Sequence, residues 1–378
     1  MKNDMLGVIF SENPEASMGE LTSLRSLAAV PLGGRYRIID FMLSNMVNSG
    51  ILKVGITTPV NYQSLTDHLG TGKDWDMDRK DDGLYILPPK ETGESNVEAI
   101  GGIERLTGIS SFLKKSKQEY VLVSDCNTIC NIDFDKVLDA HLEKEADFTL
   151  VCTPVKDLSS KDVIKHILVD VDGDSNITDM HVYPSKQVTD LSYMHMFITR
   201  RETLLEMVEY ASTHGKHQIS KDILLPAVTS DNVKVCAYEF TGYRKKVDSI
   251  KSFYKVNIDM LNKGVRDELF GLSEDNPIFT KIKDSVPTKY GKDAEVQNSF
   301  IADGCKIEGT VRNSVLSRGV HVAKGAVVEN SIIMQDAEIM ENCEVDNAIF
   351  DKGVILRSGK KLAGADTYPL VIAKETVV

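Results

Sequence analysis

The sequence is short of positive charge and of long apolar runs. Its 44 Lys and Arg residues against 56 Asp and Glu residues give a formal net charge of −12. Because phosphate-rich surfaces are bound through basic patches, this balance argues against nucleic acid and against an anionic membrane as partners. No apolar run approaches the roughly 20 residues that a membrane-spanning helix needs.

Cysteine is also scarce, with six residues in a chain of 378. The cysteines are scattered, and none forms the close pairs, with a second pair or with His partners, that a structural zinc site requires. A secretory signal is missing too, because the apolar run after Met5 is short and follows Asp4 rather than a basic segment. We therefore expect a reduced, cytoplasmic protein whose cysteines are small buried side chains.

The N-terminal two thirds does contain a regular alternation of apolar patterns. Strand-like runs and helix-like segments follow one another in the order 6–10, 37–49, 52–57, 98–115, 120–124, 134–144 and 148–154. This alternation predicts an α/β domain with a Rossmann-like, mixed, mostly parallel sheet covered by helices. Ligands of such sheets bind beyond the carboxyl ends of the strands, so the loops after Phe10 and Ser124 should be neighbours.

The C-terminal part carries a different pattern, which follows a polar segment at 273–292. From Gly319 small residues recur every six positions, and an apolar column holds Val327, Ile333, Ile339 and Val345. A hexapeptide period predicts short strands stacked into a parallel β-helix. We therefore predict an α/β domain at 1–272, a linker at 273–292 and a β-helix domain at 293–378.

The six-residue spacing also bears on His321. An exposed His between coils would suggest a hexapeptide-repeat acyltransferase, but the spacing puts His321 in the apolar column with Val327 and Ile333. We therefore expect a structural role for this side chain. The open ends and flat sides of a β-helix favour association with other subunits, including copies of the same chain.

The segment from Leu21 to Ile51, LTSLRSLAAVPLGGRYRIIDFMLSNMVNSGI, closely resembles a segment of the ADP-glucose pyrophosphorylases. These are the glucose-1-phosphate adenylyltransferases of glycogen and starch synthesis. The similarity continues through 221–223 and 252–254 to the hexapeptide repeats and so spans nearly the whole chain. It implies a nucleotidyltransferase domain followed by a left-handed β-helix, a tetrameric assembly, and attack of glucose 1-phosphate on the α-phosphorus of ATP with release of pyrophosphate.

The loop after the first strand departs from that family. Active members have a Gly-Gly-x-Gly-x-Arg pattern here, and glycine lets backbone N–H groups approach the triphosphate closely. The matching residues are 12–17, ENPEAS, so the glycines are gone and the Arg has become Ser17. Glu12 and Glu15 add negative charge, and Pro14 removes a backbone donor. A carboxylate about 4 Å from a phosphate charge costs roughly 1 kcal/mol even in water, so this loop should repel ATP.

Other positions that the resemblance links to chemistry are replaced as well. Nucleotidyl transfer depends on positioning and on cancelling charge with metal and cations. The family's Lys after the loop matches Leu27, its catalytic metal-binding Asp matches Asn127, and the Lys that holds glucose 1-phosphate matches Tyr183. Asp125, two residues before Asn127, either substitutes for the lost carboxylate or starts a turn, and both interpretations stay open.

The resemblance leaves one acidic metal position, at Asp222, which is a weak signal. Mg²⁺ in phosphate chemistry relies on one or two carboxylates, so we expect no required cofactor, and Mg²⁺ only if residual activity exists. The sugar-contacting Ser-Met-Gly run appears as 192–194, SYM, and the later Arg-Asp-Val-Gly segment appears as 245–248, KKVD. Both changes remove substrate contacts.

Three arginines survive near the effector region of relatives: Arg25, Arg35 and Arg37. Arginine suits bidentate phosphate binding. These side chains are either surface or interdomain salt-bridge residues, or they bind a sugar-phosphate effector or a neighbouring subunit. The sequence leaves both interpretations open.

A retained scaffold with lost chemistry resembles the GlgD-type subunits, the regulatory members of the family. The resemblance implies a catalytically impaired subunit that co-assembles with the catalytic ADP-glucose pyrophosphorylase subunit and modulates it allosterically. Two alternatives remain. One is an active nucleotidyltransferase with an unusual triphosphate loop, which would use Asp125 and Asp222 for metal. The other is a stand-alone sugar-phosphate-sensing protein.

Overall fold

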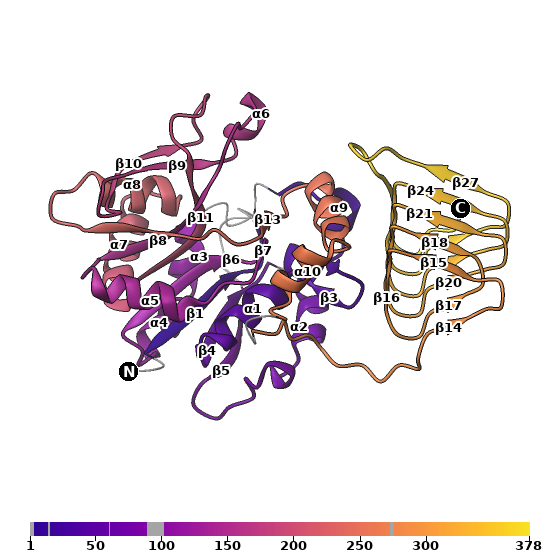
Figure 1. The fold of residues 1–378 in the computed structure, drawn as a ribbon. Helices are drawn as coiled ribbons and strands as arrows, with labels where there is room; N and C mark the ends of the chain where they lie inside the picture. The colour runs from indigo at the N-terminus through magenta and orange to yellow at the C-terminus, as the bar shows by residue number, and fades with distance from the viewer. Residues whose placement is uncertain (1–3, 14–15, 60, 89–101, 273–275) are drawn as a thin grey trace.

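The computed structural model describes residues 4–13, 16–59, 61–88, 102–272 and 276–378. It shows an α/β domain and a stack of short strands, joined by an extended segment that runs along the lower edge of the view (Figure 1). Across these ranges, no helix combines the length and the apolar character needed to cross a membrane.

The α/β domain is built on a nine-stranded sheet. Its main path runs β10-β9-β11-β6-β1-β4-β5, while β8 pairs with β11 and β12 pairs with β8. The strands are β1 Met5–Phe10, β4 Lys53–Thr57, β5 Gly83–Leu87, β6 Tyr120–Asp125, β8 Phe148–Pro154, β9 Ile167–Val171, β10 Ile177–Val182, β11 Leu191–Arg200 and β12 Val235–Glu239. Strand β1 is parallel to β4 and β6, whereas β11 is antiparallel to β6, β8 and β9. The predicted mixed sheet is confirmed.

Helices cover both faces of this sheet (Figure 1). They are α1 Ile38–Asn48, α2 Gln63–Leu69, α3 Gly102–Gly108, α4 Ser110–Lys115, α5 Phe134–Glu143, α6 Ser160–Val163, α7 Arg201–Thr213, α8 Leu225–Val228, α9 Ile250–Asp259 and α10 Lys263–Leu269. Successive side chains of a strand point to opposite faces, so Ile9 joins a core with α1, while Val8 and Phe10 join a core with α3 and α7. Residues 98–101 of the predicted helix at 98–115 lie outside the described residues.

The C-terminal domain is a parallel β-helix with three sheets, as predicted (Figure 1). One sheet holds β14 Lys289–Tyr290, β17 Lys306–Ile307, β20 His321–Val322, β23 Glu338–Ile339 and β26 Ile355–Leu356. The second holds β15 Glu295–Gln297, β18 Thr310–Arg312, β21 Val327–Glu329, β24 Glu344–Asp346 and β27 Lys361–Ala363. The third holds β16 Phe300–Ile301, β19 Val315–Leu316, β22 Ile332–Ile333, β25 Ala348–Phe350 and β28 Leu370–Ile372. Strand β14 lies inside the predicted linker, so the first coil begins before residue 293.

The coil period differs from the predicted fixed six residues. Register partners in the middle coils lie 17 residues apart, as in 321 with 338, 327 with 344 and 332 with 349. Two sides of a coil therefore take six residues and the third takes five. Val328 is fully buried, whereas Val327 is half-exposed, so the inward column continues from Val328 to Ile333 after a five-residue step.

The corrected period moves His321 out of the core. Val322 is fully buried, and His321 is half-buried on the outer surface. The His321 Nε2 atom lies 3.1 Å from Glu308 Oε2. The expectation that His321 occupies the inward column was wrong because one side of each coil is a residue shorter than the other two.

Candidate functional site

The loops that follow β1 and β6 meet at the carboxyl edge of the sheet. The Cys126 N–H donates to the Phe10 carbonyl at 3.0 Å, and Asn13 Nδ2 donates to Asp125 Oδ2 at 3.5 Å. The predicted proximity of these loops is confirmed. This edge is where ligands of α/β sheets bind, so the altered residues of the resemblance are positioned around it.

The loop after β1 is held by hydrogen bonds to other parts of the chain. Glu12 Oε1 accepts the Leu27 N–H at 2.8 Å, and Arg105 of α3 donates to the Glu12 carbonyl at 2.7 Å. The Ser17 N–H donates to the Asp248 carbonyl at 2.8 Å. Burial raises the pKa of Glu12 despite the Leu27 hydrogen bond and the nearby Arg105. The backbone N–H of Ser17 and the oxygens of Glu12 are thus bonded within the chain.

The position of the family's lysine is occupied by a core residue. Leu27 begins the short 3-10 helix Leu27–Ala29 and is 1% exposed in the core beneath α1. The Leu27 side chain therefore offers no cation to a phosphate. Ser17 is exposed, and the two remaining altered loop positions, Pro14 and Glu15, lie outside the described residues.

Asn127 is fully buried and hydrogen-bonded to the backbone of Val247. Its Nδ2 atom donates to the Val247 carbonyl at 2.9 Å, and the Val247 N–H donates to the Asn127 carbonyl at 2.8 Å. Its Oδ1 atom is buried and has no hydrogen-bond partner among the described residues. The segment at Asn127, the position that the resemblance matches to the family's metal carboxylate, is therefore bonded to the Val247 backbone through both its amide side chain and its carbonyl.

Lys246 brings a positive charge into the same site. Strand β13, Arg244–Lys246, pairs with β7, Thr128–Cys130, which places Lys246 opposite Thr128. Lys246 Nζ lies 3.2 Å from His195 Nε2, and His195 Nδ1 lies 3.8 Å from Asp125 Oδ2. Since an ammonium only donates, Nε2 accepts and Nδ1 carries the proton that faces Asp125.

Burial keeps His195 neutral. It lowers the His195 pKa well below its usual value, and Lys246 and His166 lower it further. His195 adopts a φ of 58° within an irregular stretch of β11, where the register shifts between Tyr193 and Phe197. This local conformation lets β11 turn the imidazole toward Lys246. The contact carries no local sequence signal, because it depends on an irregularity of β11 at His195 and on a partner, Lys246, that is distant in the sequence.

Aromatic rings lie at the residues that the resemblance matches to the family's sugar and sugar-phosphate contacts. The Tyr193 ring stacks on His195 with centroids 5.3 Å apart, and burial raises the Tyr193 pKa well above its usual value. Tyr183 is half-buried with a φ of 53°, and its N–H donates to the His166 carbonyl at 3.1 Å. Burial lowers the His166 pKa to about 4. Tyr183, which the resemblance matches to a phosphate-binding lysine, is thus joined through its backbone to His166.

Asp222 belongs to a separate hydrogen-bond network. It lies in the π-helical turn η4, Ser220–Leu224, and its Oδ2 accepts the N–H groups of His217 at 3.0 Å and Gln218 at 2.8 Å. Burial raises its pKa, but these backbone hydrogen bonds and nearby lysines outweigh that effect and leave the pKa lowered. Asn127 is bonded to Val247 instead, so the structure does not join these two predicted metal positions in one network.

Arg25 and Arg37 lie where the two domains meet. Arg25 is buried and forms an ion pair with the fully buried Asp351 of the β-helix. Arg37 Nη1 donates to the Ser64 carbonyl at 2.6 Å, and burial lowers its pKa to about 10. Burial, together with Arg37 and Arg25, lowers the pKa of Lys352 to about 7. These side chains gather positive charge at the boundary, beside Asp351 and with Asp40 and Asp67 near Arg37.

Arg35 lies on the exposed side of the same boundary. Its guanidinium is 6.0 Å from the Tyr36 ring centroid. It also lies close enough to the β-helix residue Arg318 to lower the pKa of that guanidinium, after the larger effect of burial. We call Arg25, Arg35, Arg37, Arg318 and Lys352 the boundary cations. Arg318 and Lys352 carry no local sequence signal, because only the docking of the β-helix brings them to the arginines.

Comparisons with known proteins place these features in context. The nucleotidyl transferase family model matches residues 18–263. A second model, for the GlmU-like C-terminal hexapeptide family, matches residues 284–368. The chain is 36% identical over 375 residues to a glycogen biosynthesis protein GlgD of Bacillus subtilis, covering 99% of this chain and 97% of that protein.

Two further relatives show similar coverage. A GlgD protein of Geobacillus stearothermophilus is 38% identical over 328 residues, covering 87% of this chain and 84% of that protein. A glucose-1-phosphate adenylyltransferase of Clostridium perfringens is 31% identical over 379 residues, covering 100% of this chain and 96% of that protein. Both kinds of relative therefore align with both domains.

Proposed function

The chain belongs to the nucleotidyltransferase family of glycogen biosynthesis, and from that premise we propose that it is a regulatory, catalytically impaired subunit of ADP-glucose pyrophosphorylase. The observation that carries this proposal is the metal position itself. Asn127 is buried and bonded to Val247, and the Lys246 ammonium lies 3.2 Å from His195, whose other ring nitrogen faces Asp125. A site that contains its own ammonium and lacks the carboxylate has little affinity for Mg²⁺.

The loss of charge stabilisation extends to the nucleotide. Nucleotidyl transfer needs a metal ion and cationic side chains to balance the triphosphate as pyrophosphate leaves. Glu12 occupies the loop and is bonded to the Leu27 N–H, so opening the loop for ATP would break this contact and bring a carboxylate toward phosphate. Turnover by the chain alone is therefore expected to be very low, and no cofactor is required for its proposed role.

The retained architecture supports assembly with a catalytic chain. Both domains keep their cores, and Tyr254 of α9 donates to the Asn330 carbonyl of the β-helix at 2.6 Å. A partner from the same family has matching surfaces, so pseudo-symmetric contacts between like folds are available. We propose the catalytic glucose-1-phosphate adenylyltransferase subunit as this partner. The assembly works in the cytoplasm, where the buried free cysteines stay reduced.

The boundary cations offer a route for control by a sugar-phosphate effector. An anion there would be attracted by Arg37 and would favour the protonated form of Lys352, whose pKa of about 7 leaves it partly neutral at physiological pH. Because Arg25 is tied to Asp351, binding would also act on the contact between the domains. An effector regulates only if it binds one arrangement of the subunits more tightly than another.

Sedimentation of the purified chain with its catalytic partner tests the assembly. We expect a hetero-oligomer at micromolar concentrations. We also expect the chain alone to form ADP-glucose at less than about a thousandth of the partner's rate, which corresponds to an activation barrier roughly 4 kcal/mol higher. Separate sedimentation of the two chains would contradict the proposal. A high rate for the isolated chain that is lost on Asp222→Ala would instead establish an active enzyme with an unusual triphosphate loop.

The boundary cations also favour a second candidate function, a stand-alone sugar-phosphate sensor. This alternative predicts that fructose 1,6-bisphosphate or glucose 6-phosphate raises the melting temperature of the chain alone, and that Arg37→Gln abolishes this rise. It also predicts that the chain does not bind the catalytic subunit. A rise that requires the hetero-oligomer favours the regulatory subunit instead.

A further inference from the structure

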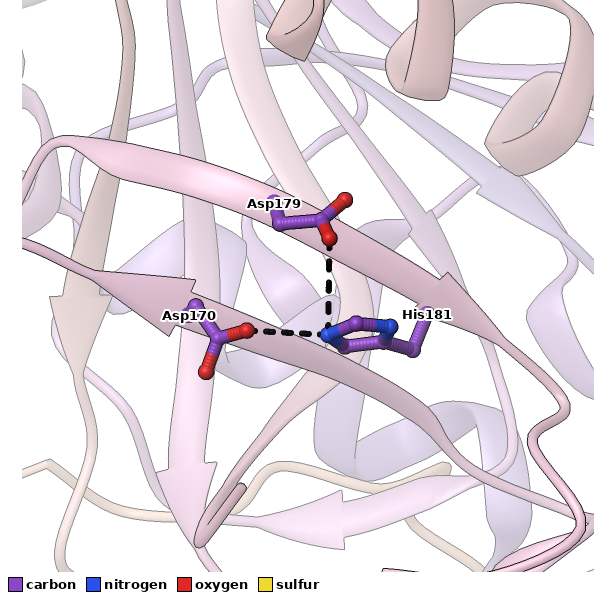
Figure 2. Close-up of side chains that lie close together, drawn as sticks. All are labelled: Asp170, Asp179 and His181. Carbon is purple, nitrogen blue, oxygen red and sulfur yellow. Dashed lines mark hydrogen bonds and ion pairs between the residues drawn. The ribbon is translucent and has the colours of Figure 1, made fainter. Parts of the chain in front are cut away.

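A second cluster of ionisable side chains lies far along the sheet from the degenerate site, on the hairpin formed by β9 and the edge strand β10. His181 Nε2 lies 2.9 Å from Asp170 Oδ2 and 3.7 Å from Asp179 Oδ2. Figure 2 shows the two carboxylates approaching the same imidazole nitrogen from different strands. One ligand atom from each of the three residues lies within 4.8 Å of the others.

The strand register explains why these groups converge. Asp170 and Asp179 are direct cross-strand partners, and His181 lies two residues beyond Asp179, on the same face because side chains alternate along a strand. The register shift between Ile177 and Asp179 sets this alignment. Like charges directly opposite each other destabilise a sheet. A cation bound between these two carboxylates would therefore stabilise the hairpin.

The donor set indicates which cation fits. We propose that Asp170, Asp179 and His181 form a binding site for one divalent transition-metal ion, with zinc as the best match. Ligand atoms about 2.0 to 2.2 Å from such an ion are about 3 to 3.6 Å apart, and the two measured separations from His181 are 2.9 and 3.7 Å. Small side-chain rotations would complete the geometry.

The remaining coordination positions face solvent. The side chains are 44% exposed for Asp170, 54% for Asp179 and 28% for His181, so water or a fourth ligand from another molecule can complete the shell. An imidazole ligand favours Zn²⁺, Ni²⁺ or Co²⁺ over Mn²⁺. Mg²⁺ and Ca²⁺ prefer shells made of oxygen and are expected to bind weakly or not at all. This site is independent of the proposed regulatory function.

Calorimetric titration of the full chain with Zn²⁺, and with Co²⁺ followed by its visible spectrum, tests the proposal. We expect one ion per chain and a cobalt spectrum without a thiolate charge-transfer band, since the cysteines are buried. His181→Gln and Asp179→Asn should each weaken binding at least about 10-fold, the lower end of effects seen for groups that support a metal. Circular dichroism without metal checks that each variant is folded.

Asp174→Asn is the matched control. Asp174 is exposed in the turn of the same hairpin and lies outside the cluster, so its substitution removes the same charge without removing a ligand. We expect a change in affinity of less than about 2-fold, because screening weakens the effect of an exposed charge. The proposal is overturned if binding is not saturable, if His181→Gln binds as tightly as the unsubstituted chain, or if Asp174→Asn weakens binding as much as Asp179→Asn.

Discussion

In the proposed function, Asn127 and Lys246 account for the chemical difference between this chain and a metal-dependent nucleotidyltransferase. The Asn127 amide donates to the Val247 carbonyl, and the Lys246 ammonium lies 3.2 Å from His195 Nε2. A divalent ion placed there would face the Lys246 ammonium, and Asp125 approaches the site at His195 Nδ1. On this proposal the two residues act in the same direction, since an amide and an ammonium in place of carboxylates both raise the positive charge of the site.

Restoring both acidic residues should restore metal binding. In the Asn127→Asp, Lys246→Asp variant, we expect Mg²⁺ to raise the melting temperature, because an ion at 100 times its Kd adds about 2.7 kcal/mol of stability. The unsubstituted chain and a Lys246→Met variant should not respond. An equal Mg²⁺ response in the unsubstituted chain would contradict this account of the site.

Lys352 predicts a pH dependence of stability. Its folded-state pKa of about 7 lies below the usual 10.5, so the folded protein binds this proton less tightly than the unfolded chain does. The resulting penalty is complete below about pH 7 and decreases as the pH rises toward 10.5. Lys352→Met should therefore stabilise the protein more at pH 6, by about 1 kcal/mol or more, than at pH 9.

Urea denaturation at the two pH values measures this difference. Lys324→Met is the control, because that lysine is on the same domain with its side chain 79% exposed. A Lys352→Met effect that is equal at pH 6 and pH 9 would mean that burial does not shift this titration.

Comparison with the family's motifs identifies residues that lie within or next to those motifs in the sequence. Ser17, Leu27, Asn127 and Tyr183 follow from position along the chain. The contact of Lys246 with His195 depends instead on the irregular register of β11, and the approach of Lys352 to Arg37 depends on the docking of a separate domain. No local pattern in the sequence specifies either.

At the scale of elements, the α/β strands and helices before residue 155 were largely predicted because their apolar residues follow clear periods, although the helix predicted at 98–115 is divided into α3 and α4. Helix α1 and strand β8 match their predicted ranges within about a residue. The β-helix was predicted as a fold but with the wrong period. A signal for the true period was present, because Asn313, Asn330 and Asn347 recur every 17 residues and all adopt positive φ, which Asn tolerates at turns.

The corrected period makes neighbouring valines behave differently. Val328→Ala should destabilise the β-helix by about 2 kcal/mol, because it removes methyl groups from a fully buried coil interior. Val327→Ala, on the outer surface of the same strand, should cost less than about 0.5 kcal/mol. Thermal unfolding of both variants compares the two losses directly. A larger loss for Val327→Ala than for Val328→Ala would instead support an inward column that contains Val327.

The whole molecule depends on contacts between its two domains, among which the Arg25 to Asp351 ion pair is fully enclosed. Arg25→Met leaves the Asp351 carboxylate buried without its cation, and we expect a loss of about 3 to 5 kcal/mol in urea denaturation. The double variant Arg25→Met, Asp351→Leu should regain most of this loss. A loss in the double variant as large as in the single variant would show that the carboxylate is not the cause.

At the same scale, we propose that the chain keeps the family's two docked domains and acts on a separate catalytic chain. The steady-state rate of ADP-glucose formation by a fixed amount of catalytic subunit, with increasing amounts of this chain, measures that claim most directly. We predict a saturable change in kcat or KM of about 5-fold or more, the lower range of allosteric coupling. A rate that is unchanged at saturating amounts of this chain would contradict it.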